Sequence, residues 1–230
     1  DMVILDYRTG QLKAIVGGRN LEGQKIYNRA LNPRQPGSSV KPFAVYTPAI
    51  DSKNYTAASV IDDIPTYLSG NDEKRWPINW YESYSGYKYK YRGISTLREG
   101  IEQSMNVVTV KLANMLGIEK CINYMKKFGI TTIVDEGRSN DHNLSAVALG
   151  GMTQGIKPIE LAEAFGTFGN NGTRVDTITY TEVIDTNGDI ILNNKPNKTL
   201  VIEEDVSFIV RDMMRSAVTK GIATKAQIRK

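Results

Sequence analysis

The spacing of hydrophobic residues is strand-like near the two ends of the chain and helix-like between them. Two short apolar runs, 2–6 and 11–16, flank a polar turn and predict a β-hairpin. Asn187-Gly188, between the runs 179–184 and 189–192, predicts a second hairpin. Helical spacing predicts helices in the following segments: 39–50, 96–115 with a break near Ser104, 118–128, 158–165 and 200–218.

This order of elements favours an α+β fold. We expect a mostly antiparallel sheet built from both ends of the chain, with a helical subdomain beside it. The 230 residues, 40% of them hydrophobic, are enough to bury a sizeable core. Residues 61–92 show neither period and are rich in Tyr and Trp, which predicts a long loop. A loop of this length in a compact domain is functional or partly disordered.

Composition narrows the chemistry. The net charge of +4 comes from mixed acidic and basic residues without an arginine-rich arm, so nucleic-acid binding is not indicated, whereas an anionic cell-surface polymer is a compatible partner. His142 is the only histidine, which argues against a histidine-based triad and against a multi-histidine metal site. Any serine chemistry is therefore expected to use a lysine base. No transmembrane run is present, and the chain starts within a strand pattern, as expected of an excised domain whose anchor precedes it.

The strongest candidate for chemistry is the segment 34–43, Arg-Gln-Pro-Gly-Ser-Ser-Val-Lys-Pro-Phe. It predicts a turn that leads into a helix with Ser38 at the N-cap. Lys41 then follows on the same face, where its amine can take the hydroxyl proton if its pKa is lowered. The tetrapeptide alone is weak evidence, because about one Ser-x-x-Lys match is expected by chance. A second match begins at Ser85 and is interpreted as loop, and the neutral interpretation of Ser38 is a cap beside an exposed lysine.

A second candidate is Ser104-Met105-Asn106, at the break between two predicted helices. There Ser104 could relay a proton to a leaving amine, and Asn106 could hold a substrate amide. Ser-x-Asn also occurs at 52–54 and 69–71, but only Ser104 has helices on both sides. The neutral interpretation is a helix N-cap.

These segments resemble the transpeptidase domain of class A penicillin-binding proteins, whose Ser-x-x-Lys motif is well known. The likeness covers nearly the whole chain in order. It rests on the following residues: 3–6, 10, 14–18, 28–30, 34–38, 91–93, 96–98, 104–106, 148–151, 158–162 and 171–172.

The resemblance implies a penicillin-binding-protein/serine β-lactamase-like fold over residues 1–230. It implies that Ser38 is the nucleophile, Lys41 its base, Ser104 a proton relay and Asn106 a substrate-binding residue. The implied substrates are peptidoglycan stem peptides ending in D-Ala-D-Ala, with β-lactams as covalent inhibitors and no metal or cofactor. The implied location is the extracytoplasmic face of a bacterial membrane, with an anchor and a glycosyltransferase domain upstream.

The family pattern also has a third element, Lys-Thr/Ser-Gly, which does not occur in these 230 residues. Residues 218–227 resemble the segment that precedes it. We therefore expect the strands that carry this element to come from a C-terminal fragment of the same domain, as a second chain.

Two alternatives stay open on the sequence. A serine β-lactamase would need a carboxylate that activates water, for which Glu119 and, more plausibly by its position, Glu136 are candidates. A non-catalytic β-lactam sensor or scaffold would share Ser38 and Lys41 without transferring the acyl group.

Overall fold

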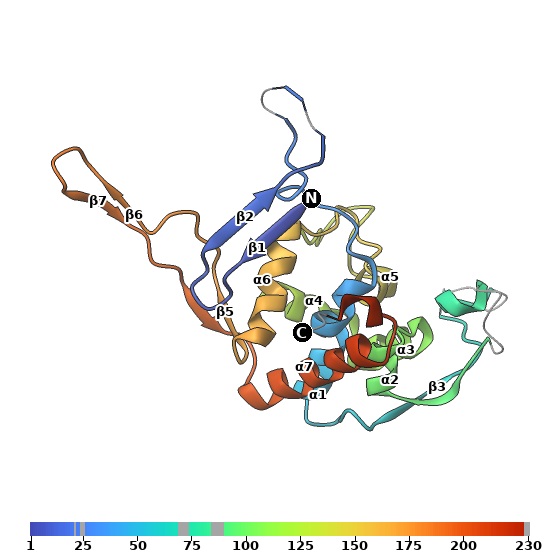
Figure 1. Ribbon diagram of the computed structural model, residues 1–230. Helices are drawn as coiled ribbons and strands as arrows, with labels where there is room; N and C mark the ends of the chain where they lie inside the picture. Colours follow the sequence, from blue (N-terminus) through green and yellow to red (C-terminus); the bar gives the residue numbers. More distant parts are fainter. Residues whose placement is uncertain (21, 24–25, 69–73, 84–89, 228–230) are drawn as a thin grey trace.

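The computed structural model describes the whole chain except residues 21, 24–25, 69–73, 84–89 and 228–230 (Figure 1). The α-helices are α1 (Thr47–Asp51), α2 (Leu97–Glu102), α3 (Asn106–Leu116), α4 (Ile118–Lys127), α5 (Leu144–Leu149), α6 (Pro158–Gly169) and α7 (Glu204–Thr219). The strands are β1 (Met2–Leu5), β2 (Leu12–Val16), β3 (Val60–Asp63), β4 (Gly93–Thr96), β5 (Thr173–Val175), β6 (Glu182–Ile184), β7 (Ile190–Asn193) and β8 (Lys198–Leu200). Shorter helical turns are η1 (Gly37–Val40), η2 (Pro42–Tyr46), η3 (Trp80–Ser83) and η4 (Thr224–Ala226).

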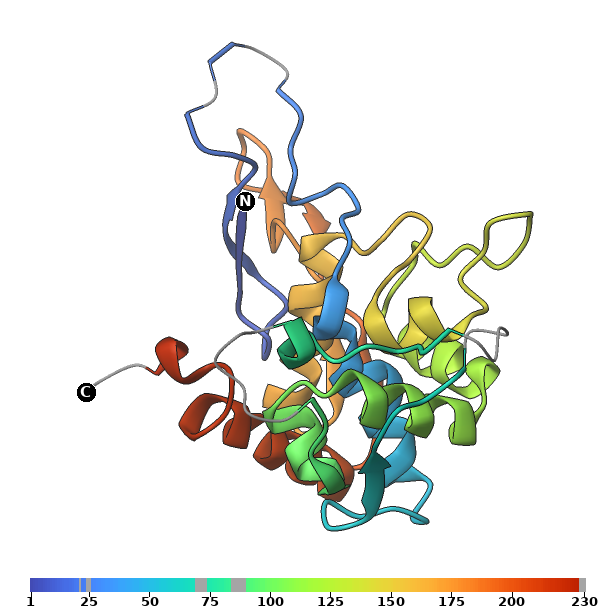
Figure 2. The ribbon, with the colours of Figure 1, turned by 90° about the vertical axis from the view of Figure 1, so that its right-hand side faces the viewer.

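The helical region is organised around the continuous segment η1–η2–α1. Every residue from Val40 to Ile50 is buried, because the segment is apolar on all sides apart from Lys41 and Thr47. Helices α3, α4 and α7 pack around it, and α5 contacts its first two turns (Figures 1 and 2). The predicted helix over 39–50 is confirmed, although its middle is a π-helical turn between Pro42 and Tyr46.

The strands confirm the α+β prediction and pair antiparallel in four two-stranded sheets among the described residues. The predicted N-terminal and Asn187-Gly188 hairpins are the β1–β2 and β6–β7 pairs. Strands β5 and β8 pair with each other, so the N-terminal hairpin reaches the later strands only through the bridge between Gln11 and Ile178. We expected the two ends of the chain to form one sheet. Within the described residues, this bridge is the only strand pairing that connects them.

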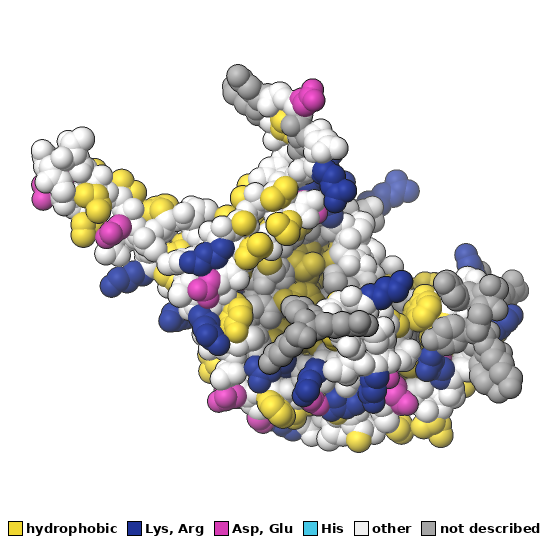
Figure 3. All heavy atoms as spheres, in the orientation of Figure 1, with side chains coloured by type: hydrophobic (Ala, Val, Ile, Leu, Met, Phe, Trp, Pro, Cys, Tyr) yellow, Lys and Arg dark blue, Asp and Glu magenta, His cyan; other side chains and the backbone are white. Residues whose placement is uncertain are grey.

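The N-terminal hairpin has two unlike faces. Its half-buried face, which includes Val3 and Leu5, faces the side of α6, whereas Met2, Ile4 and Val16 are exposed. Figure 3 shows further hydrophobic side chains over the projecting β6–β7 hairpin, where Ile191 is 61% exposed.

The prediction of one loop over 61–92 is wrong at its start. Ile61 and Asp63 are buried in β3, and β3 pairs with β4 in the register Val60–Thr96 to Asp63–Gly93. The strand was not predicted because its second buried position is an aspartate, a residue type that is usually exposed on the surface. Part of the remaining loop, 69–73 and 84–89, lies outside the described residues.

Gly150 ends α5 in the left-handed conformation and touches the backbone of Gly37, the residue that begins η1. A Cβ at Gly150 would overlap the carbonyl oxygen and the nitrogen of Gly37. This close approach sets the distance between α5 and the turn that precedes Ser38.

Gly150→Ala should therefore destabilise the fold more than an alanine at a left-handed glycine in open space. We expect a loss of at least about 3 kcal/mol in urea unfolding, from strain and overlap together. Gly188, at φ +92 with no atom near its Cβ position, provides the matched control. Gly188→Ala should cost only about 1–2 kcal/mol, and equal losses for the two variants would contradict this account.

Candidate active site

The segment that leads into Ser38 is tied to the loop between α5 and α6. Arg34 and Ile156 exchange two backbone hydrogen bonds of 2.9 and 2.8 Å. The Gln35 side-chain carbonyl accepts from the Met152 backbone N–H at 2.9 Å, and its amide donates to the Met152 carbonyl. These four bonds hold the chain at both residues just before the turn.

Ser38 is not the N-cap that its sequence context predicts. Gly37 has φ +56 and starts a 3-10 turn, so the cap position falls on Pro36, and Ser38 lies inside the first turn. It is the Ser39 hydroxyl that bonds back, to the Pro36 carbonyl at 2.7 Å. The Ser38 side chain is exposed and has no hydrogen-bond partner among the described residues. A first-turn position leaves its backbone N–H without an intrahelical acceptor.

Lys41 lies one turn after Ser38, and its backbone N–H bonds to the Ser38 carbonyl. Its side chain is only 2% exposed, so the neutral interpretation of an exposed lysine is wrong. The Nζ atom contacts three oxygens: the Ser104 carbonyl at 2.9 Å, Ser104 Oγ at 3.2 Å and Asn106 Oδ1 at 2.7 Å. The structure thus brings Lys41, Ser104 and Asn106 together, although 63 residues separate Lys41 from Ser104.

Burial gives the Lys41 amine the property that a base needs. Removal from water disfavours the ammonium form and lowers the pKa of Lys41 from 10.5 to about 7. A substantial fraction of the amine is then neutral at neutral pH, with a lone pair available for a hydroxyl proton.

Ser104 lies in a strained connection between α2, which ends at Glu102, and α3, which begins at Asn106. Its φ of +49 is a left-handed value that non-glycine residues rarely adopt. The predicted break between two helices is confirmed here. The Asn106 side chain is held at both ends, since Nδ2 donates to the Ile78 carbonyl at 2.8 Å while Oδ1 faces Lys41.

The two carboxylates considered for a β-lactamase, Glu119 and Glu136, do not contact Lys41, Ser104 or Asn106 in the described structure. Glu136 is exposed in the loop between α4 and α5, and Glu119 contacts the ring of His142 at 2.6 Å. Neither carboxylate is hydrogen-bonded to Lys41 or Ser104 within the described residues. The same part of the chain contains no group of three or more His, Cys, Asp or Glu side chains that could hold a metal ion.

Sequence reasoning missed two buried polar residues next to this cluster, Asp63 and Asn79. They are 0% and 1% exposed, and Asn79 contacts the first residues of α3. A polar residue at an inward position of a strand is the one signal in the sequence that could have found Asp63.

A family model described as "Penicillin binding protein transpeptidase domain" matches residues 2–230. The chain belongs to this family. Penicillin-binding protein 1A of Clostridium botulinum is 38% identical over 227 residues, which cover 95% of this chain and 26% of the relative. The chain thus spans about a quarter of the length of the curated relatives it matches.

Solved structures of this family share the fold. A crystal structure of penicillin-binding protein 1A from Haemophilus influenzae has a TM-score of 0.77 at 22% identity, and covers 95% of this chain and 36% of its own. Penicillin-binding protein A of Mycobacterium tuberculosis, solved as an imipenem acyl-enzyme complex, has a TM-score of 0.69 at 18% sequence identity. The superposition covers 84% of this chain and 45% of the Mycobacterium tuberculosis chain. The recognition of a class A penicillin-binding domain in the sequence is therefore confirmed. In the described part of this family member, no helix is both long and apolar enough for a membrane span.

The lowered pKa of Lys41 predicts a specific pH dependence of stability. Because the folded pKa is about 7 and the unfolded value 10.5, the unfolded chain binds more protons between these two values. Stability of the wild type therefore rises with pH in that window. Lys41→Met lacks this titration, so its stability relative to the wild type should fall by about 1.4 kcal/mol per pH unit.

The measurement is urea unfolding of both proteins from pH 7 to 10. A matched control is Lys53→Met, since Lys53 is exposed and paired with Asp205, and its pKa is raised rather than lowered. A difference between Lys41→Met and the wild type that stays constant over this range would show that Lys41 titrates normally in the folded state.

Proposed function

We propose that this domain is a serine-type D-Ala-D-Ala transpeptidase that cross-links peptidoglycan stem peptides. The observation that carries the proposal is the buried Lys41 amine, one helical turn after an exposed Ser38 and in contact with both Ser104 and Asn106. A lone serine is a poor nucleophile, and this geometry supports the assignment of Lys41 as its base, Ser104 as a proton carrier and Asn106 as the side-chain amide that binds substrate.

The proposed reaction has two acyl transfers. Lys41 Nζ takes the Ser38 proton as Oγ bonds to the carbonyl carbon between the last two D-alanines. The C–N bond then breaks, and the leaving amine receives a proton through Ser104. An amine from a second stem peptide attacks the ester, the C–Oγ bond breaks, and Ser38 regains a proton while the new amide loses one. Asn106 holds the amide of the bound peptide, and the N–H of Ser38 faces the developing oxyanion.

β-Lactams would follow the first half of this route and stop at the acyl-enzyme. The acyl-enzyme described for the Mycobacterium tuberculosis neighbour supports this expectation, since that protein shares the fold. A serine β-lactamase is not favoured, because the candidate carboxylate Glu136 is exposed and has no hydrogen bond to Ser38, Lys41 or Ser104 among the described residues. Product analysis with stem peptides distinguishes a transpeptidase from a scaffold that is acylated but transfers nothing, because only the transpeptidase forms a cross-linked product.

The proposed substrate determines where the domain works. Peptidoglycan lies outside the cell membrane, so we place the domain on the extracytoplasmic face, held there by an anchor outside this sequence. The proposed reaction requires no metal or cofactor, because each proton transfer is assigned to a side chain of the domain.

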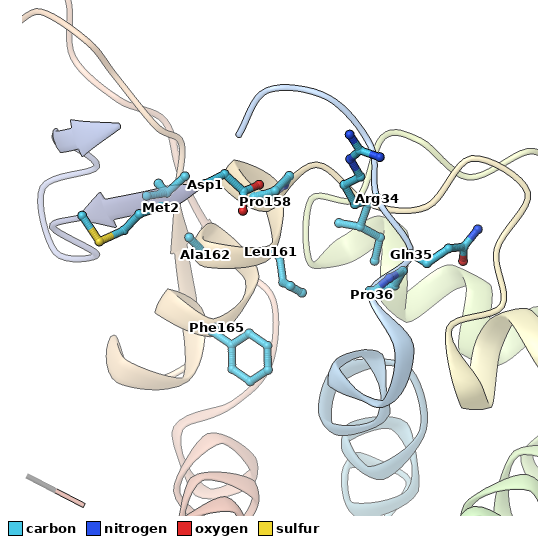
Figure 4. A pocket seen from close by; sticks show the side chains of 11 residues that line it. Asp1, Met2, Arg34, Gln35, Pro36, Pro158, Leu161, Ala162 and Phe165 are labelled. Atoms are coloured by element: carbon cyan, nitrogen blue, oxygen red, sulfur yellow. The ribbon is translucent and has the colours of Figure 1, made fainter. Parts of the chain in front are cut away.

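We also propose that a strand with the Lys-Thr/Ser-Gly element, absent from these 230 residues, docks beside β1. A groove of about 490 Å³ lies between β1, α6 and the segment 34–36, just before Ser38. In Figure 4 Leu161 and Phe165 of α6 and Arg34 line it from two sides. Within the described residues β1 pairs only with β2, so its other edge is open to a further strand. Such a strand would supply the second oxyanion N–H.

The assignment of the nucleophile is tested with a fluorescent penicillin. Ser38→Ala should abolish covalent labelling, because the variant lacks the proposed nucleophile, and the circular dichroism spectrum should stay unchanged. Ser104, whose hydroxyl also lies beside Lys41, is assigned to proton transfer and should not become acylated. Ser39→Ala, one residue along the same turn, and Ser85→Ala, in the second Ser-x-x-Lys, should label normally. Mapping of the modified peptide to any serine but Ser38 would refute the assignment.

The strand proposal is tested by comparing labelling rates of the full-length protein and of the isolated 230-residue chain. Without the second oxyanion donor, the isolated chain should acylate at least about 100-fold more slowly. Equal rates, with intact mass confirming a single 230-residue species, would show that the groove needs no further strand for catalysis.

A further inference from the structure

A buried carboxylate–amide pair, Asp63 and Asn79, contacts the start of α3 next to the Ser104-Met105-Asn106 segment. Asp63, the last residue of β3, is 0% exposed, and Asn79, in the loop before η3, is 1% exposed. Asn79 Nδ2 donates to Asp63 Oδ1 at 2.7 Å. Groups this deeply buried are costly unless every polar atom is paired, so the pair is expected to have a definite task.

Asn79 caps helix α3 from outside the helix. Its Oδ1 accepts the backbone N–H groups of Asn106 at 3.0 Å and Val107 at 3.1 Å. Met105, at the N-cap position itself, makes no side-chain cap bond. The neighbouring carbonyl of Ile78 accepts the side-chain amide of Asn106. Two consecutive residues of one loop therefore fix both the backbone and the side chain of Asn106.

Asp63 decides which way the Asn79 amide points. Its other oxygen accepts the Tyr81 hydroxyl at 2.5 Å and the Arg92 backbone N–H at 2.8 Å. A carboxylate only accepts, so Asn79 must turn its NH₂ group toward Asp63 and its oxygen toward α3. The amide orientation is thus set by charge, and with it the two bonds to α3.

Trp80, the first residue of η3, contacts the residue before Ser104. Trp80 Nε1 donates to the Gln103 carbonyl at 2.9 Å. Ser104, between these fixed points, keeps its φ of +49, a conformation that persists only where the surroundings over-determine it.

We propose that Asn79, oriented by Asp63, is a positioning residue for the acylation step. It holds Asn106 so that Oδ1 stays 2.7 Å from Lys41 Nζ, and it holds Ser104 within reach of the same amine. This inference rests on the proposed function, because it assigns Asn79 an effect on the reaction of Ser38. A displacement of about 1 Å in such a constellation can cost about 100-fold in rate.

The test exchanges the two side chains in the full-length protein. Asn79→Ala removes both bonds to α3, and Asp63→Asn places a donor against either the Arg92 N–H or the Asn79 amide. Each single variant should lower the acylation rate by fluorescent penicillin about 10–100-fold. The double variant Asp63→Asn/Asn79→Asp keeps one carboxylate and satisfies every partner: the bond between positions 63 and 79 reverses direction, whereas the Tyr81 and Arg92 donors and the two N–H groups of α3 keep theirs. Its rate should therefore return to within about threefold of wild type.

Tyr81→Phe is the matched control. It removes one donor from the same carboxylate but leaves the bonds of Asn79 to α3, so its acylation rate should stay near wild type while its stability falls. Rates are measured on the folded fraction, with thermal unfolding recorded for each variant. Asn79→Ala that unfolds earlier but acylates at the wild-type rate, or a double variant as slow as Asp63→Asn, would overturn the positioning role. Absence of Ser38 labelling in the wild type would instead refute the proposed function itself.

Discussion

The burial of the Lys41 amine is the interaction on which the site depends. An amine taken out of water is unfavourable as an ion, and here it is compensated by oxygens of a segment 63 residues further along the chain. The contact joins η1–η2–α1, at the centre of the core, to the connection between α2 and α3. Neither segment could shift without leaving a buried amine or a buried carbonyl unpaired. The contact is therefore a constraint on the fold as well as the basis of the proposed catalysis.

The surrounding elements act mainly to keep that contact in place. On one side, the turn before Ser38 is held against the α5–α6 loop by its close contact with Gly150 and by the Arg34–Ile156 bridge. On the other side, Asp63 and Asn79 hold the start of α3. Between them Ser104 adopts a left-handed backbone conformation. The strain is concentrated at one residue, while the elements on either side use ordinary hydrogen bonds.

The local parts of this arrangement could be predicted from the sequence. Periodicity identified the central helix and both hairpins, and the three-residue spacing placed Lys41 on the face of Ser38. The exact start of the helix could not be predicted, because it depends on the left-handed φ of Gly37, and the backbone of Gly37 lies against Gly150, more than 100 residues further along the chain. Asn79 was missed for a related reason: its partners lie in β3 and α3, and no local pattern reports a hydrogen bond across such distances.

The hydrogen bonds of Lys41 also indicate how one amine could serve both proton transfers of the proposed reaction. An ammonium group has three donors, and three acceptors surround Nζ, namely the Ser104 carbonyl, Ser104 Oγ and Asn106 Oδ1. A neutral amine keeps two donors, so one acceptor must be released when the lone pair turns toward Ser38. The carbonyl oxygens can only accept, whereas the Ser104 hydroxyl, at 3.2 Å the longest of the three contacts, can also donate. In the proposed reaction Ser104 is therefore the partner that would change from acceptor to donor as Lys41 gains and loses its proton. The Ser38 proton would then reach the leaving amine through the Lys41 nitrogen and the Ser104 hydroxyl.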